Sequence, residues 1–109
     1  MQYVYPAIFR EDKEMPGTWC IEFPDIEGAV TQGNSLYDAI FMAEDVLNLF
    51  LTDWEDAKAS GEVFNNKIAE PTPIKKVVAE PDEFSTSAFV TLIKADTDAY
   101  RKVLAEMQK

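Results

Sequence analysis

The first third of the chain alternates between apolar and polar positions in short runs, which predicts β-strands. We expect three strands, over residues 3–9, 18–23 and 29–31. Pro16-Gly17 and Pro24-Asp25 are turn sequences that separate these runs. Strands joined by such short loops form an antiparallel meander with one buried face. Pro6 lies inside the first run and predicts an edge position or a bulge, because proline has no N–H to donate to a neighbouring strand.

From Ser35 onward the apolar spacing changes to three and four residues, which predicts an amphipathic helix that packs on the sheet. Ser35 is a suitable N-cap, and Asp38 follows at the capping-box position. Gly61 is the expected stop, so the helix covers about 35–59. The predicted buried stripe comprises Leu36, Ile40, Ala43, Leu47, Phe50 and Trp54. Phe41 and Val46 widen the stripe, with extra core contact as the favoured interpretation and contact with a partner as the alternative.

Residues 62–85 form a proline-containing connection in which Pro71-Thr72-Pro73 excludes a helix. Residues 86–95 follow as a strand that is apolar on both faces, which predicts a position inside the sheet. Asp96 is the expected N-cap of a last helix over 96–108. The order is therefore β-β-β-α-β-α. We predict a single α+β domain over 1–109, a two-layer sandwich with its core in 1–59 and 86–95.

Charge narrows the choice of partner. Among 109 residues, 20 Asp and Glu oppose 10 Lys and Arg, so the formal charge is −10. An acidic surface repels phosphates, which argues against direct nucleic-acid binding, and it attracts a basic protein. Solubility alone is the alternative explanation of this charge. Lone Cys20 and the lack of a secretory signal favour the cytoplasm, and no apolar run reaches the ~20 residues of a membrane span.

Catalytic chemistry has little support in the sequence. The chain has no histidine and one cysteine, so histidine-based catalysis and a zinc site are not expected, and neither is any cofactor. Carboxylates that bind two metal ions, as in a nuclease, remain an alternative. The candidates for that alternative are Glu22, Asp25, Glu44, Asp45 and Asp96. No acid lies between Gln2 and Arg10 on the first strand, so a solvated acidic face is the favoured interpretation.

Three sequence runs together resemble the N-terminal domain of the HicB family of antitoxins. The runs are Tyr5-Pro6-Ala7-Ile8-Phe9, Trp19-Cys20-Ile21-Glu22-Phe23-Pro24-Asp25-Ile26-Glu27-Gly28 and Thr31-Gln32-Gly33-Asn34-Ser35-Leu36-Tyr37-Asp38-Ala39. Further similarity covers 43–51, 70–74, 89–96 and 100–102. The resemblance implies a partial ribonuclease H-like fold without nuclease activity. It also implies a bacterial antitoxin of a toxin–antitoxin pair, whose partner is a small basic mRNA-cleaving toxin of the HicA type.

This sequence also departs from the pattern of the HicB family. Many members of the family carry a C-terminal DNA-binding module, but this sequence ends at Lys109, so we expect no such module here. The oligomeric state stays open, with a homodimer as one alternative. From charge and turn position, we expect exposed acids to contact the toxin, namely Glu11, Asp12, Glu22, Asp25 and Glu27. A stand-alone regulatory or structural domain without a toxin is the remaining hypothesis.

Overall fold

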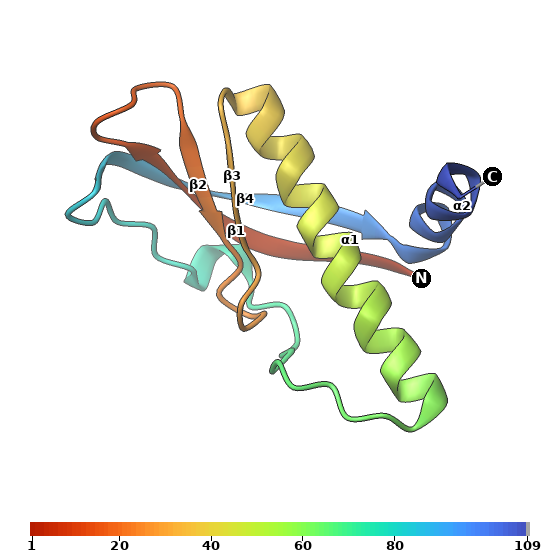
Figure 1. Cartoon of the computed structure of the whole chain (residues 1–109). Coiled ribbons are helices and arrows are strands. Elements are labelled where there is room, and N and C mark those ends of the chain that lie inside the picture. Colours follow the sequence, from red (N-terminus) through yellow and green to blue (C-terminus); the bar gives the residue numbers. More distant parts are fainter. Residues whose placement is uncertain (109) are drawn as a thin grey trace.

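A computed structural model describes residues 1–108 and shows a four-stranded antiparallel sheet with one long helix across one face (Figure 1). The elements are β1 (Gln2–Asp12), β2 (Trp19–Glu22), β3 (Val30–Gly33), α1 (Leu36–Ser60), the 3-10 helix η1 (Ile74–Lys76), β4 (Ser85–Asp96) and α2 (Thr97–Met107). The predicted α+β class and the order of three strands, helix, strand and helix are confirmed. The short η1 lies inside the predicted connection.

The sheet order is β3-β2-β1-β4, which differs from two expectations. β4 was expected inside the sheet and instead forms its edge, whereas β1 lies between β2 and β4. The apolar pattern of β4 reports on its two faces and carries no information about its two edges. Leu92 and Phe89 on β4 accordingly keep 50% and 37% of their surface exposed.

The inner position of β1 is compatible with Pro6 for a local reason. The N–H of Asp12 donates to the carbonyl of Thr18, so the even-numbered residues of β1 direct their backbone groups toward β2. Pairing with β2 extends only over residues 8–11 of β1, with Asp12 at its end. The nitrogen of Pro6 therefore points toward a side where no strand lies, and its missing N–H costs no ladder bond.

The core lies between the sheet and α1. It collects odd-numbered side chains of β1 and β2 together with one face of the helix. The buried members include Tyr5, Ala7, Phe9, Ile21, Phe23, Ala39, Ala43, Leu47, Leu51, Ile93 and Ala95. Burial of this apolar surface is the main stabilising contribution to the fold.

The buried stripe of α1 is rotated from the predicted one. Leu36 and Ile40 each remain 45% exposed, Phe41 is 60% exposed, and Ala39 is fully buried. Gly33 explains the rotation, because a Cβ at this position would lie 2.5 Å from the Cα of Ala39. The first turn of the helix thus rests on the backbone of β3, and a small residue occupies the contact.

The connection between α1 and β4 follows the end of the sheet and then crosses the face opposite α1 (Figure 1). Ile26 and Ile68 form an isolated antiparallel bridge, and the Asp25 carbonyl accepts from the N–H of Ala69. Further along, Glu80 accepts a hydrogen bond from Arg10 through its backbone carbonyl. Within residues 1–108, no helix combines the length and the apolar character that a membrane span requires.

Candidate interaction surface

Two of the five predicted contact acids stabilise the β1–β2 hairpin. The Glu11 carboxylate accepts from the N–H of Gly17 at 2.9 Å and from the hydroxyl of Ser87 at 3.3 Å. The Asp12 carboxylate accepts from the N–H groups of Glu14 and Met15 at 2.8 and 3.0 Å. Both side chains therefore have a structural task in the hairpin. Their contact with a partner stays a prediction.

Asp25 connects two distant segments. Its carboxylate accepts from the N–H of Thr72 at 2.8 Å and from the Thr72 hydroxyl at 2.6 Å, which fixes the proline segment to the β2–β3 turn. Glu22 forms an ion pair with Arg10 on the sheet face opposite α1. Glu27 is exposed, and its backbone bonds to Lys67 and Asn66. The structure thus separates the five acids between the hairpin, the opposite face and the turn.

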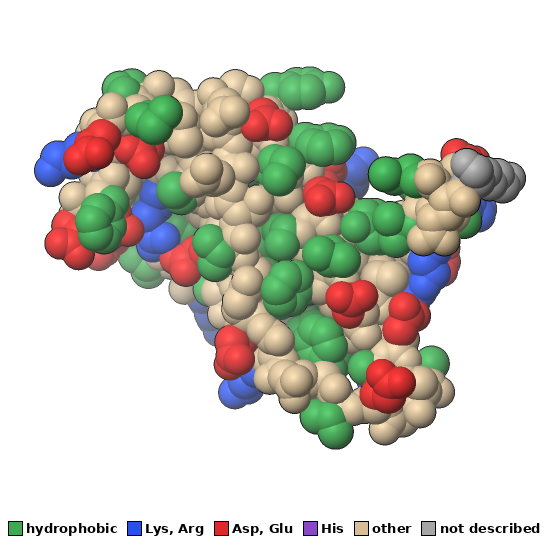
Figure 2. All heavy atoms as spheres, in the orientation of Figure 1, with side chains coloured by type: hydrophobic (Ala, Val, Ile, Leu, Met, Phe, Trp, Pro, Cys, Tyr) green, Lys and Arg blue, Asp and Glu red, His purple; other side chains and the backbone are tan. Residues whose placement is uncertain are grey.

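Of a surface on the outer side of α1, sequence reasoning indicated only Phe41, as an alternative partner contact, and missed the rest. Tyr37, Phe41, Asp45, Leu49 and Asp53 follow one another at a spacing of four residues and form what we call the α1 ridge. Tyr37, Phe41 and Leu49 are 87%, 60% and 42% exposed, and both aspartates are exposed. Figure 2 shows hydrophobic and acidic side chains intermixed over this helix. The sequence did carry a signal for this surface: a row of bulky residues spaced four apart does not coincide with the predicted buried stripe.

The α1 ridge also carries uncompensated charge. Helix α1 contains six acidic side chains and one lysine. Three of these acids are engaged within the chain, because Asp38 accepts from Asn34 while Glu55 and Asp56 pair with Arg101. Among residues 1–108, the ion pairs do not include Asp45 or Asp53. Exposed apolar area beside unpaired negative charge is suited to a cationic partner with an apolar contact surface.

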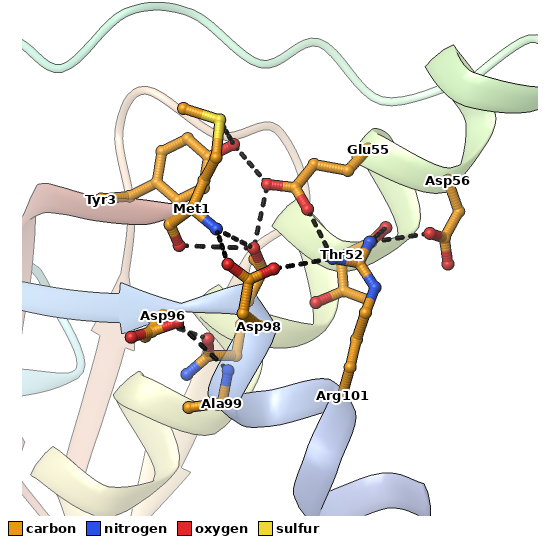
Figure 3. Close-up of polar contacts among 11 residues, drawn as sticks. Met1, Tyr3, Thr52, Glu55, Asp56, Asp96, Asp98, Ala99 and Arg101 are labelled. Atoms are coloured by element: carbon orange, nitrogen blue, oxygen red, sulfur yellow. Dashed lines mark hydrogen bonds and ion pairs between the residues drawn. The ribbon is translucent and has the colours of Figure 1, made fainter.

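A polar cluster at the other end of α1 holds α2 in place (Figure 3). The Glu55 carboxylate accepts from the hydroxyls of Tyr3 at 2.5 Å and Thr97 at 3.0 Å and pairs with Arg101 at 2.8 Å. We call these four residues the Glu55 clasp. Arg101 also pairs with Asp56 at 2.7 Å. Because the four residues come from β1, α1 and α2, the clasp joins three elements at one corner.

Titration of the clasp reflects these contacts. Burial alone would raise the pKa of Glu55, but hydrogen bonds from Tyr3, Arg101 and Thr97 outweigh it, so the pKa lies below its usual value. Burial, followed by the hydrogen bond to Glu55, raises the pKa of Tyr3 well above its usual value. Glu55 is thus held as a carboxylate and Tyr3 as a neutral donor around neutral pH.

The acids that a metal-dependent nuclease would need do not all converge, because Glu44 and Asp96 line one groove while Glu22 and Asp25 are engaged elsewhere. Glu22 pairs with Arg10, Asp25 binds Thr72, and Asp96 caps α2 by accepting from the N–H of Ala99. In the part of the chain that the structure describes, no three His, Cys, Asp or Glu side chains are grouped so that they could hold a metal ion. A groove of about 530 Å³ lies between α1, α2 and the adjoining ends of β1 and β4, lined in part by Glu44, Lys94 and Tyr100.

Comparisons with known proteins place the fold. No protein-family model matches the sequence, and no curated protein matches it. A chain of the toxin–antitoxin complex from Streptococcus pneumoniae is similar with a TM-score of 0.67 and 22% identity, covering 92% of this chain and 73% of that one. A chain of the HicA3 and HicB3 toxin–antitoxin complex is similar with a TM-score of 0.58 and 21% identity, covering 86% of this chain and 99% of that one. The chain has a HicB-like α+β fold.

Proposed function

We propose that this chain is the antitoxin of a type II toxin–antitoxin pair, which binds and neutralises a small basic mRNA-cleaving toxin of the HicA type in the bacterial cytoplasm. The observation that supports the proposal is the structural likeness to chains of two toxin–antitoxin complexes over 92% and 86% of this chain. The three sequence runs that resemble the HicB family lie between β1 and the start of α1. The protein acts by binding, without making or breaking a covalent bond.

The α1 ridge is the surface that we assign to the toxin. A protein that cleaves RNA must attract phosphates, so its substrate-binding surface is cationic. Asp45 and Asp53 offer carboxylates to that surface, while Phe41 and Leu49 supply apolar contact between them. Bound there, the antitoxin excludes RNA sterically and by charge. The five acids predicted from the sequence would add contacts outside this ridge.

A binding experiment with a matched control tests the proposal. The product of the neighbouring gene is purified, and its affinity for this chain is measured by calorimetry at two salt concentrations. We expect Asp45→Lys combined with Asp53→Lys to weaken binding by at least about tenfold, since both charges contact the toxin. Glu14→Lys combined with Glu80→Lys changes the formal charge equally at sites outside the ridge and should weaken binding by less than about threefold.

The outcomes separate the two parts of the proposal. A neighbouring product that is not a small basic protein, or that does not bind, contradicts the antitoxin assignment. Equal weakening by both pairs of substitutions contradicts the α1 ridge as the contact surface. A toxin that continues to cleave RNA in the complex contradicts neutralisation by masking of its active site.

The non-enzymatic part of the proposal has its own test. The chain is incubated with an RNA–DNA hybrid in magnesium or manganese, and cleavage is compared with that of Asp25→Asn. We expect no cleavage by either protein, because Asp25 fixes the proline segment through Thr72. Cleavage that disappears in the variant would support a metal-dependent nuclease instead.

A further inference from the structure

The groove of about 530 Å³ between α1 and α2 lies directly beside the α1 ridge. Its α1 wall includes Glu44 and Asn48, each of which precedes a ridge residue in the sequence, and its α2 wall includes Ala99, Tyr100 and Val103. Figure 1 shows α2 next to α1 at the end of β4, and Figure 2 shows hydrophobic side chains on both helices. A partner bound on the ridge can therefore extend a side chain into the groove.

The lining of the groove suits an aliphatic chain. Ala95, Ala99 and Val103 contribute apolar surface to it, and Val103 keeps 54% of its own surface exposed. Removal of such surface from water is favourable. The long aliphatic stems of lysine and arginine cover apolar surface of this kind while their charged ends stay in contact with water or with polar groups.

The charged side chains that line the groove carry an excess of negative charge. Among the described lining residues, Glu44 and Asp96 are the acids and Lys94 is the cation. Asp96 accepts from the N–H of Ala99, and this hydrogen bond lowers the pKa of its carboxyl, so it is ionised around neutral pH. Within residues 1–108, the ion pairs include neither Glu44 nor Lys94. The Glu44 carboxylate is thus available to a cation from a partner.

The negative field of the α1 ridge reaches the α2 wall of the groove. Burial, followed by the negative charges of Asp45 and Asp53, raises the pKa of Tyr100 above its usual value. The Tyr100 ring is half-buried and forms part of the groove wall. The face of a tyrosine ring attracts a lysine or arginine cation. Nearby carboxylates and an aromatic ring therefore both favour a cationic group at this position.

We propose that the groove receives a lysine or arginine side chain of the toxin, with its aliphatic stem against Val103 and its cationic end between Glu44 and the Tyr100 ring. The inference rests on the proposed function and extends the contact surface from α1 to α2. Charge selects this occupant. A second copy of the chain carries a formal charge of −10 and nucleic acids are anionic, whereas a protein that binds RNA displays lysine and arginine.

Calorimetry with the purified product of the neighbouring gene tests the groove with two matched variants on α2. Val103→Lys fills the groove with a competing cation and should weaken binding by at least about fivefold. Met107→Lys makes the same change of charge one turn later, at a side chain that is 76% exposed and lies outside the lining, and should weaken binding by less than about twofold. Circular dichroism and thermal unfolding check that both variants keep α2 folded and docked.

Neutralisation of two lining charges reports the sign of the occupant's charge. Glu44→Gln should weaken binding by about three- to tenfold, because the cationic end loses its carboxylate. Lys94→Gln should strengthen binding by about two- to threefold, because a repulsive charge is removed. A purely structural role of the groove would weaken binding in both variants, and an anionic occupant would reverse both signs.

The outcomes separate this inference from the proposed function. A neighbouring product that does not bind the wild-type chain contradicts both. Binding that is weakened by Asp45→Lys combined with Asp53→Lys, but equally affected by Val103→Lys and Met107→Lys, contradicts the groove alone. Weaker or unchanged binding of Lys94→Gln also contradicts the groove and leaves the antitoxin assignment intact.

Discussion

Removal of the Glu55 carboxylate should detach α2 from the body of the fold. Glu55 accepts two hydroxyl hydrogen bonds and pairs with Arg101, while its side chain is 17% exposed. A single hydrogen bond to a charged group contributes about 1.5–3 kcal/mol. The three donors share one carboxylate and Arg101 is 37% exposed, so their contributions are not additive. We therefore expect Glu55→Ala to reduce the free energy of unfolding by about 3 kcal/mol.

Urea denaturation followed by circular dichroism measures this loss, and thermal unfolding should show a decrease in Tm of about 10–20 °C. Asp56→Ala is the matched control. Asp56 is the next residue on the helix and also pairs with Arg101, but its side chain is 65% exposed, so its loss should cost less than about 1 kcal/mol. Equal costs for the two variants would refute the assignment of the clasp to Glu55.

The same clasp predicts a pH dependence with a definite sign. Folding lowers the pKa of Glu55 from its usual 4.5, so its contribution is complete above that value and is lost as the pH falls through the folded-state pKa. Stability measured from pH 6 to pH 3 should therefore fall less steeply in Glu55→Gln than in the wild-type chain. An unchanged slope would show that Glu55 has the same pKa in both states.

Three further predictions follow from local geometry. Gly33→Ala should lower the free energy of unfolding, measured by urea denaturation, by about 2–4 kcal/mol, because the added Cβ would overlap the backbone of Ala39. Gly61→Ala is the control: a Cβ there meets open space, but φ is +76°, so the loss should be about 1 kcal/mol. Similar losses for the two variants would contradict the close packing of β3 on α1. Ser35→Ala removes the α1 N-cap and should cost about 1 kcal/mol in a thermal melt, unless the cap contributes nothing. Thr72→Val should accelerate proteolysis within residues 62–84, and an unchanged cleavage rate would show that Asp25 does not fix this segment.

Local chemistry could be predicted from the sequence wherever one segment sufficed. Ser35 accepts from the N–H of Asp38, Gly61 ends α1 at positive φ, and Asp96 caps α2, as expected. Each of these depends on residues within a few positions of one another. The α+β class followed from the change of apolar period at Ser35.

Features that depend on distant segments could not be predicted in this way. The edge position of β4 depends on which strand pairs with the second side of β1. The apolar pattern of a strand shows which of its faces is buried, but it does not show which strand lies beside it. The rotation of α1 depends on the contact of Gly33 with Ala39. Likewise, Asp25 was expected to be a surface acid, but it finds Thr72 at a separation of 47 residues. Carboxylate–partner pairs of this kind leave no periodic signal.

The central position of β1 has a consequence for how the protein is made. Phe9 pairs with Ile21 nearby and with Phe89, which the ribosome adds 80 residues later. The hairpin, β3 and α1 can associate during synthesis because their contacts are local, whereas β4 closes a long loop and joins last. Until β4 has been synthesised, one side of the central strand β1 therefore has no partner strand. Kinetic competition with degradation or misassembly is concentrated in that interval, before the final strand docks.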